Sequence, residues 1–229
     1  MRIYHGTAER HLEAILKEGI KPRGKIGIDN WKHTVSSNAR AVYLTTTYAL
    51  YFASNACQGG ERMVVLETNT NDLKRYRLAP DEDFLEQATR HYEEGINVQD
   101  HMGNELPRWK NNMKERVIWF RKRALSDFSH MWEKSIEYMG TVCYYATIEP
   151  KQISRYALVP RNGGIDWASD PTVTPMNFKI MGEYYRQLMR HVFDDKIESK
   201  EDIMGNFIEH LKQLSRDDVV VQNLNRIWE

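Results

Sequence analysis

The chain has 229 residues, of which 41% are hydrophobic and 28% are charged, and its 32 basic and 32 acidic residues give a formal net charge of zero. This balance excludes an intrinsically disordered chain, and the zero net charge excludes a protein that is basic throughout. The sequence has two cysteines, no apolar signal core at its start and no window near about 18 apolar residues. We therefore expect a cytoplasmic protein without disulfides or membrane spans.

The first third of the chain alternates between short strand patterns and short helix patterns. β-Branched and aromatic residues indicate the strands, and apolar residues that recur every three or four positions indicate the helices. Thr7 is a candidate N-cap for the first helix. In chain order we expect a strand at 2–4, a helix at 8–18, a Gly-, Pro- and Asn-containing loop at 20–38, a strand at 41–45, a helix at 48–56 and a buried strand at 63–67.

The remainder of the chain is predicted to add helices around two more strands. Residues 80–135 have a helix-like start at Asp81-Glu82-Asp83 and mix aromatic with charged residues, which predicts a mainly helical insertion. The strand patterns at 141–148 and 153–159 follow it. Beyond a linker, two amphipathic helices are expected at 178–192 and 199–214. We therefore predict a catalytic domain at 1–160 and a C-terminal helical extension at 161–229.

The mixture of helices and strands lacks a regular βαβ alternation. This favours an α+β protein with a mostly antiparallel or split sheet over a doubly wound parallel fold. The sequence contains no GxGxxG, GxxxxGK[ST], HExxH or GxSxG motif. The Rossmann, P-loop, zincin and hydrolase-elbow interpretations therefore lack their minimum signatures, and no metal site is expected.

The order of the early elements resembles the ADP-ribosyltransferase superfamily. The resemblance rests on Tyr4-His5-Gly6-Thr7, a helix that contains residues 15–20 (ILKEGI), the strand 41–45 (AVYLT) and a helix rich in Ala and Ser. It is closest to the diphtheria-toxin and poly(ADP-ribose)-polymerase branch, covers residues 2–67 well and covers 135–160 loosely. It implies a split antiparallel β-sheet core, here with a helical insertion and C-terminal helices, and NAD as co-substrate without a metal.

The resemblance also implies roles for residues that bind NAD. His5 would bond to the adenosine ribose, and Gly6, followed by Thr7, would clamp the nicotinamide amide through its backbone. Tyr43 and Tyr51 would sandwich the nicotinamide ring. Because their spacing is short for the branch, Tyr48 or Phe52 are alternatives for the second position. The pyrophosphate is expected near Arg23 or Arg40, which flank the loop and can pair with phosphate.

A glutamate at the start of a late strand would complete the catalytic set with His5 and Tyr43. Glu137, in Ser135-Ile136-Glu137-Tyr138, matches that position best, and Glu149 at the far end of the same predicted strand is the competitor. A carboxylate there can stabilise the oxocarbenium-like transition state on the ribose and take the proton of the attacking group.

One basic and aromatic stretch indicates the acceptor. Residues 108–123 (RWKNNMKERVIWFRKR) hold seven basic residues and one acid, with aromatic residues among them. Such a pattern suits single-stranded nucleic acid, because cations neutralise phosphates while rings stack on bases. A helix with a solvated basic face, or one that docks on an acidic antitoxin, is the alternative. The candidate contacts are Arg108, Lys110, Arg116, Arg121 and Arg123.

Taken together, these features predict a mono-ADP-ribosyltransferase that releases nicotinamide. The expected acceptor is a nucleic acid, mRNA or single-stranded DNA, ahead of protein. The chain resembles toxins of toxin–antitoxin and antiphage systems, so a cognate antitoxin is an expected partner. The alternatives are an RNA 2′-phosphotransferase, which does not depend on a catalytic glutamate, a protein-targeting transferase, and a binding module without catalysis.

Overall fold

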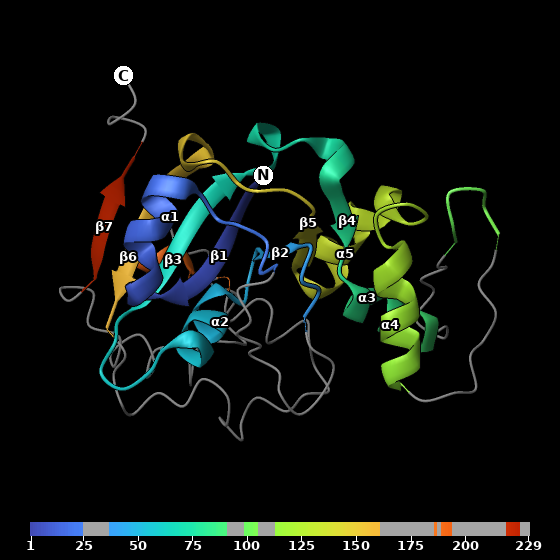
Figure 1. Ribbon diagram of the computed structural model, residues 1–229, viewed down its shortest axis with the longest axis horizontal. Helices are drawn as coiled ribbons and strands as arrows, with labels where there is room; N and C mark the ends of the chain where they lie inside the picture. The colour runs from blue at the N-terminus through green and yellow to red at the C-terminus, as the bar shows by residue number, and fades with distance from the viewer. Residues whose placement is uncertain are drawn as a thin grey trace, which may run out of the picture. The chain divides into compact units, whose positions relative to one another are not determined.

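The computed structural model describes residues 1–24, 37–90, 99–104, 113–160, 186, 189–193 and 219–224. The chain divides into two compact units: the first gathers residues 1–19, 45–72 and 148–229, and the second gathers residues 20–44 and 73–147. The protein is of the α+β class. Its helices and strands (Figure 1) are β1 (Arg2–Ala8), α1 (Leu12–Glu18), β2 (Val42–Thr45), α2 (Ala49–Ala56), β3 (Met63–Asn69), β4 (Leu78–Pro80), α3 (Glu82–Arg90), α4 (Met113–Arg123), α5 (Trp132–Met139), β5 (Thr141–Tyr144), β6 (Ile153–Val159) and β7 (Val220–Asn223).

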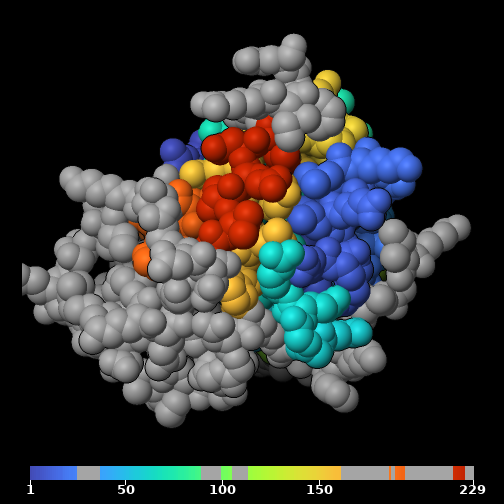
Figure 2. All heavy atoms as spheres, turned by 90° about the vertical axis from the view of Figure 1, so that its left-hand side faces the viewer, coloured from blue at the N-terminus to red at the C-terminus, as the bar shows by residue number. Residues whose placement is uncertain are grey.

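Strand β3 lies at the centre of the antiparallel sheet in the first unit. It pairs with β1 along one edge, from Arg2 opposite Asn69 to Ala8 opposite Met63, and with β6 along the other. β6 pairs in turn with β7, which Figure 2 shows in red against β6. β3 is buried from Met63 to Thr68, as expected for an apolar strand that is paired on both edges.

The helix α2 covers β1 at very close range. Ala49 and Ala53 of α2 are fully buried, and a Cβ added at Gly6 would lie 1.9 Å from the carbonyl oxygen of Ala49. Before the helix, Thr45 Oγ1 accepts hydrogen bonds from the backbone N–H groups of Thr47 and Tyr48, each at 2.9 Å. The turn after β2 and the missing side chain at Gly6 together bring the helix onto the strand.

Phe193 connects the later part of the chain to this sheet. Its ring stacks on the ring of Tyr4 with centroids 5.5 Å apart, and the guanidinium of Arg155 lies 4.4 Å from its centre. Arg155 also donates to Glu67 Oε2 at 2.7 Å, which neutralises a buried carboxylate on β3.

In the second unit the strand order is β4-β5-β2. β4 and β5 are antiparallel, with Leu78 opposite Tyr144 and Pro80 opposite Val142. The helices α3 and α4 of this unit lie within residues 80–135, where the helical insertion was expected, and α5 begins there and ends beyond it at Met139. Their core is formed by large apolar side chains that are 2% exposed or less, namely Phe84, Leu85, Phe120, Phe128 and Met131.

The first strand is longer than predicted. β1 continues through His5, Gly6 and Thr7 to Ala8, and a 3₁₀ turn at Glu9–His11 precedes α1, so Thr7 does not cap a helix. The physical reason is the partner strand. Pairing with β3 satisfies the backbone groups of these residues along the whole strand, and that pairing is not visible in the local pattern.

Two other strand predictions also change. β5 ends at Tyr144 rather than at 148, because its partner β4 is only three residues long. β7 forms in the region that was expected to be a helical extension, where the valines from Val219 to Val221 meet an open edge of β6. The helices predicted at 178–192 and 199–214 lie largely outside the described residues, although residues 189–192 are helical.

The composition predicts neither a membrane span nor a disulfide. None of the helices in the described ranges has the length and apolar character needed to cross a membrane. Cys57 and Cys143 are free thiols, and both are buried.

Candidate functional site

Tyr43 lies on β2, and its hydroxyl group is held by two hydrogen bonds within the second unit. The backbone N–H of Asn38 donates to the hydroxyl oxygen at 2.7 Å, and the hydroxyl donates to Glu82 Oε1 at 2.5 Å. Burial, followed by the charges of Cys143 and Glu82, raises the pKa of Tyr43, so the hydroxyl stays protonated and remains a donor. The orientation of the Tyr43 ring is therefore fixed.

Glu82, at the start of α3, connects three elements although it is only 2% exposed. Besides the bond from Tyr43, Oε1 accepts a hydrogen bond from Arg121 Nε of α4 at 3.0 Å, and Cys143 Sγ of β5 lies 3.7 Å from Oε2. A buried carboxylate is tolerated when it has a counter-charge and donors, and Glu82 has both. We call this group the Glu82 cluster and define it as Asn38, Tyr43, Glu82, Arg121, Cys143 and Tyr145.

Asn38 ties the end of the loop before β2 into this cluster. Its Nδ2 donates to the Tyr145 hydroxyl at 3.1 Å, and its Oδ1 accepts from the backbone N–H of Arg40 at 3.0 Å. Asn38 is 4% exposed, so these bonds satisfy polar atoms that water does not reach. Burial raises the pKa of Tyr145, and the charges of Cys143 and Glu82 add to the rise.

Asp81 adds a second buried carboxyl group beside Glu82. Its Oδ1 accepts a hydrogen bond from the backbone N–H of Asp83 at 2.9 Å, and its own backbone N–H donates to Ser135 Oγ at 3.1 Å. Burial, followed by the charges of Asp83 and Glu82, raises the pKa of Asp81 well above its usual value. Several acidic groups therefore lie close together where β4 meets α3, and acids with perturbed pKa values concentrate at functional sites.

In the first unit, His5, Gly6 and Thr7 lie next to one another on β1. His5 and Gly6 are half-buried, Thr7 is buried, and all three are opposite β3. Because α2 packs on Gly6, the structure brings this segment together with the helix that carries Tyr51. The close packing also gives Gly6 a structural reason to be glycine, alongside the backbone clamp that the resemblance implies.

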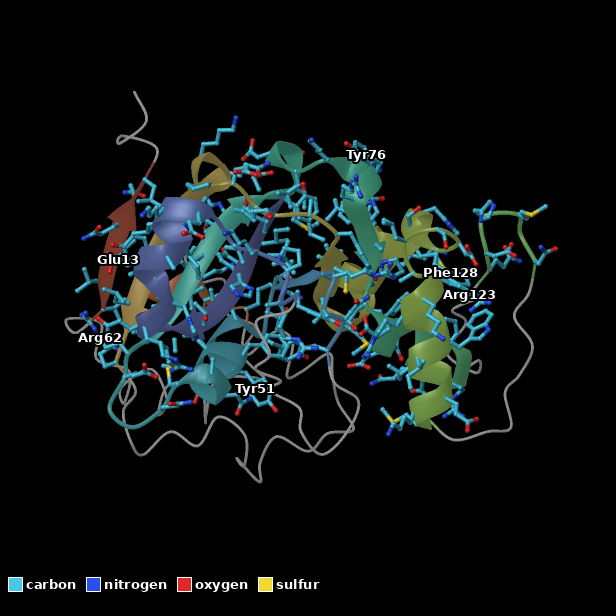
Figure 3. The ribbon with its side chains drawn as sticks, in the orientation of Figure 1. Glu13, Tyr51, Arg62, Tyr76, Arg123 and Phe128 are labelled. Atoms are coloured by element: carbon cyan, nitrogen blue, oxygen red, sulfur yellow. The ribbon has the colours of Figure 1, made fainter. Side chains whose placement is uncertain are left out.

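The aromatic side chains of α2 and its N-terminal neighbour are clustered. Tyr51, labelled in Figure 3, meets Phe52 edge-on with centroids 5.6 Å apart, and Tyr48 meets Phe52 in the same way at 6.5 Å. All three are half-buried. Burial raises the pKa of Tyr48 to about 12, against the opposing effect of the Arg186 charge. The structure leaves all three as candidates for the second stacking position.

Arg23 and Arg40 lie at the two ends of the loop whose residues 25–36 are outside the described ranges. Arg23 Nη2 donates to the carbonyl oxygen of Ser37 at 2.8 Å, and the N–H of Gly24 donates to the carbonyl oxygen of Ala39 at 2.6 Å. These bonds join the two ends of the loop. Arg23 is thus used in loop closure and is half-buried, whereas Arg40 is exposed and is the better placed of the two for a phosphate group.

The prediction that Glu137 enters a strand is wrong. Glu137 is exposed on α5, and β5 begins only at Thr141. The helix forms because Trp132, Ser135 and Ile136 make a buried face, and it ends at a glycine with φ of 72°. The catalytic role of Glu137 stays a prediction, but it can no longer be argued from a position at the start of a strand.

Glu149, the competing glutamate, has a different local role. It precedes the 3₁₀ turn Pro150–Gln152 and forms a reciprocal capping box with Gln152. Its backbone N–H donates to Gln152 Oε1 at 2.8 Å. Its side chain is exposed and engaged in the cap, which gives it a structural explanation.

Two of the predicted nucleic-acid contacts on α4 are paired with glutamates inside the second unit. Arg116 lies 2.6 Å from Glu86, whose side chain is fully buried, and Arg121 lies 3.0 Å from Glu82. These guanidinium groups stabilise buried carboxylates, so their presence in the sequence needs no nucleic acid to explain it.

The other cations of this stretch have different surroundings. Arg123 lies over the ring of Trp119 at 4.3 Å and 3.7 Å from Asp127, and Figure 3 labels it near Phe128. Lys114 and Lys122 are exposed on α4. Arg108 and Lys110 lie outside the described residues.

The sequence interpretation did not single out Glu82 or Asn38. Its only trace of Glu82 was the run Asp81-Glu82-Asp83, and acids at a helix start are ordinarily explained by the helix dipole. It also overlooked Glu67, which ends the apolar part of β3, is buried, and accepts a hydrogen bond from Ser154 Oγ at 2.9 Å. In each case the missing information was a partner from a distant part of the chain.

A search for metal-binding groups and comparisons with known proteins complete the description of these residues. Within the ranges that the structure describes, no three His, Cys, Asp or Glu side chains form a group that could hold a metal ion. No family model matches the chain, and no curated protein matches its sequence.

Proposed function

We propose that the protein is an NAD-dependent mono-ADP-ribosyltransferase with a split antiparallel sheet of the ADP-ribosyltransferase type. In this proposal it transfers ADP-ribose to a macromolecule, a nucleic acid ahead of a protein, and releases nicotinamide. It acts in the cytoplasm as a toxin or effector that a cognate antitoxin neutralises. The last part rests on the resemblance to toxins of this kind alone.

The arrangement of β1, β2 and α2 carries the proposal. Tyr4, directly before His5, pairs with Thr45, which follows Tyr43 by two residues on β2. The next helix, α2, then packs on Gly6. A His-Gly-Thr segment, then a Tyr strand and a small-residue helix, is the chain order that the resemblance implies, and the pairing of β1 with β2 and the packing of α2 on Gly6 support it.

The unequal pairing of β1 supports a split sheet. β1 pairs with β3 over its whole length but with β2 at the single position Tyr4–Thr45. A full ladder keeps neighbouring strands side by side, and β1 has such a ladder with β3 alone among these two partners.

The Glu82 cluster fits the chemistry as a support for Tyr43. Cleavage of the nicotinamide–ribose bond moves positive charge onto the ribose, the acceptor forms the new bond at that carbon, and nicotinamide leaves with the electron pair. A stacking ring that is already fixed lowers the orientational cost of this step. Tyr43 is fixed by Glu82 and Asn38, so Glu82 acts as a positioning residue. Glu137 remains the proposed catalytic carboxylate.

The purified protein, incubated with adenylate-labelled NAD and separate pools of RNA, DNA and protein, tests this proposal. We expect label on a nucleic-acid pool and an equal amount of released nicotinamide. Tyr43→Phe, which keeps the ring, should retain more activity than Tyr43→Ala. An absence of both label and nicotinamide in all pools, with folded protein, overturns the proposal in favour of a binding module.

An RNA 2′-phosphotransferase is the second candidate, and the position of Glu137 favours it. A phosphotransferase does not depend on a glutamate at the start of β5, and that strand begins at Thr141. Glu137→Gln separates the two functions. The transferase should lose most of its activity, by about 10²-fold or more if the carboxylate stabilises the transition state. A phosphotransferase should remove a 2′-phosphate from RNA equally well with either residue.

A further inference from the structure

Four consecutive side chains are exposed on the 3₁₀ turn that leads into β4. Lys74, Arg75, Tyr76 and Arg77 provide three cations and one ring, with no acid among them. Tyr76 is 66% exposed, and Figure 3 shows it on the outer side of the turn. Exposed aromatic rings among cations are uncommon unless something binds them, because a tyrosine ring is usually at least partly packed.

The backbone of this turn is held firmly in place. Leu73 before it and Leu78 after it are buried, at 6% and 1% exposure. The carbonyl oxygen of Arg77 accepts a hydrogen bond from the N–H of Tyr145 at 2.9 Å, and the N–H of Arg77 donates to Lys74 at 2.8 Å. Because the backbone is already ordered, ligand binding costs entropy only in the exposed side chains.

Two of the cations lie close to aromatic rings. The guanidinium of Arg77 lies 5.4 Å from the ring centre of Tyr76, and that of Arg75 lies 5.6 Å from the ring centre of Trp132. Arg75 also pairs with Glu133 at 2.9 Å, but both side chains are mostly exposed, at 76% and 59%. An ion pair of this kind holds its partners weakly and does not prevent Arg75 from meeting a phosphate.

We propose that Lys74, Arg75, Tyr76 and Arg77, which we call the KRYR surface, bind single-stranded nucleic acid. The cations contact successive phosphates, and a base stacks on the open face of Tyr76. An acidic peptide would use the cations but leave the ring without a role, so a nucleic acid explains more of the surface. The inference deepens the acceptor part of the proposed function, on which it rests, although the binding itself requires no NAD.

This surface is an alternative to the site expected from the sequence, which stays a prediction. On α4, Arg116 and Arg121 are paired with Glu86 and Glu82. On the KRYR surface, by contrast, no cation pairs with a buried carboxylate among the contacts described. The exposed lysines of α4, Lys114 and Lys122, then provide a matched control of equal charge.

Fluorescence anisotropy with labelled single-stranded RNA and DNA of about ten nucleotides, measured without NAD, tests the proposal. We expect Tyr76→Ala to weaken binding by about tenfold and Tyr76→Phe to restore it. Lys74→Gln with Arg77→Gln should lower the slope of log Kd against log salt by about 0.7 per lost phosphate contact. Lys114→Gln with Lys122→Gln should bind as the unchanged protein does.

Several results would overturn the proposal. These are undiminished binding by Tyr76→Ala, a larger loss in the lysine control than in the KRYR variants, or no binding of either oligonucleotide at low salt. Poly-glutamate that binds tightly and responds to the charge variants but not to Tyr76→Ala would identify an acidic protein partner instead. If NAD is cleaved while oligonucleotides do not bind, this inference fails alone; if they bind without NAD cleavage, the proposed function fails alone.

Discussion

The Tyr43 hydroxyl is held in place by an asparagine N–H on one side and a glutamate on the other. Glu82 in turn carries Arg121, so one carboxylate oxygen joins β2, α3 and α4. A hydrogen bond to a buried charge of this type contributes about 1.5 to 3 kcal/mol. At the scale of single residues, Glu82 therefore joins a hydrogen bond from Tyr43 and an ion pair with Arg121 in the second unit.

Gly6 provides a sharp test of packing at the same scale. Gly6→Ala places a methyl group 1.9 Å from the carbonyl oxygen of Ala49, a backbone atom that cannot turn away. We expect a loss of about 3 kcal/mol or more in the free energy of unfolding, measured by urea denaturation. Gly60→Ala is the control, because nothing lies within 4 Å of its added Cβ and it should change stability by about 0.5 kcal/mol or less. Equal effects of the two substitutions would contradict the close approach of α2.

Asp81 predicts how stability depends on pH. In the folded protein the pKa of Asp81 lies above its unfolded value of about 3.9. The contribution of Asp81 to the free energy of unfolding is therefore complete below the unfolded pKa, and it is lost as pH rises through the folded pKa. Asp81→Asn keeps the Oδ1 acceptor for the Asp83 N–H and removes the buried charge. We expect the variant to show a flatter thermal unfolding profile from about pH 4 upward. At about pH 8 it should unfold at least a few degrees higher than the unchanged protein. A profile that falls equally steeply in both proteins would show that Asp81 is not the group responsible.

At the scale of elements, α4 is attached to α3 by its ion pairs. Arg116 and Arg121 point to acids of α3, and α4 also presents Val117 and Phe120 to the core. The helix therefore has both an internal and a solvent-exposed side. Two of its basic residues, Arg116 and Arg121, compensate buried carboxylates, whereas Lys114 and Lys122 are exposed.

The pair Arg116–Glu86 should be far more important for stability than an exposed pair. Arg116→Ala removes the Arg116 charge from the fully buried Glu86, and we expect a loss of about 3 to 5 kcal/mol in the free energy of unfolding. Arg75→Ala removes a partner of the exposed Glu133 and should cost about 1 kcal/mol or less. Urea unfolding of both variants measures the difference. Arg116→Ala with Glu86→Gln should recover part of the loss, and no recovery would mean that packing, not charge, dominates.

At the scale of the whole molecule, each unit is assembled from segments that are distant in sequence. The first unit takes residues from both ends of the chain, and the second takes two internal segments. The boundary at 160 between a catalytic domain and an extension stays a prediction, while β7 pairs with β6 and Phe193 stacks on Tyr4. Long-range strand pairs of this sort are set by tertiary structure.

Hydrogen exchange should follow the pairing in the first unit. Amides of β3, which is paired on both edges and buried over most of its length, should exchange slowest. Amides of β7, where three of four residues are exposed, should exchange fastest of the strands in this unit. Exchange measured by mass spectrometry after proteolysis gives both values. Equal protection of β3 and β7 would contradict this ranking.

The sequence by itself determined the types and approximate places of most elements. The period of apolar residues and the β-branched runs placed β2, β3, β6 and α2, because these patterns depend on local chain geometry. It also placed the His5-Gly6-Thr7 segment ahead of the Tyr43 strand, which is the basis of the NAD proposal. The antiparallel α+β class followed from the same patterns.

Only the tertiary structure decided which side chains meet. It extended β1 through Gly6, added β4 and β7, moved Glu137 onto a helix and placed Glu82 against Tyr43. The physical reason is that strand pairing and buried ion pairs join residues far apart along the chain, and their partners leave no periodic trace in the local sequence. Two of the charges that suggested a ligand on α4, Arg116 and Arg121, pair with buried carboxylates, and the exposure of the turn at Tyr76 became visible only once burial was known.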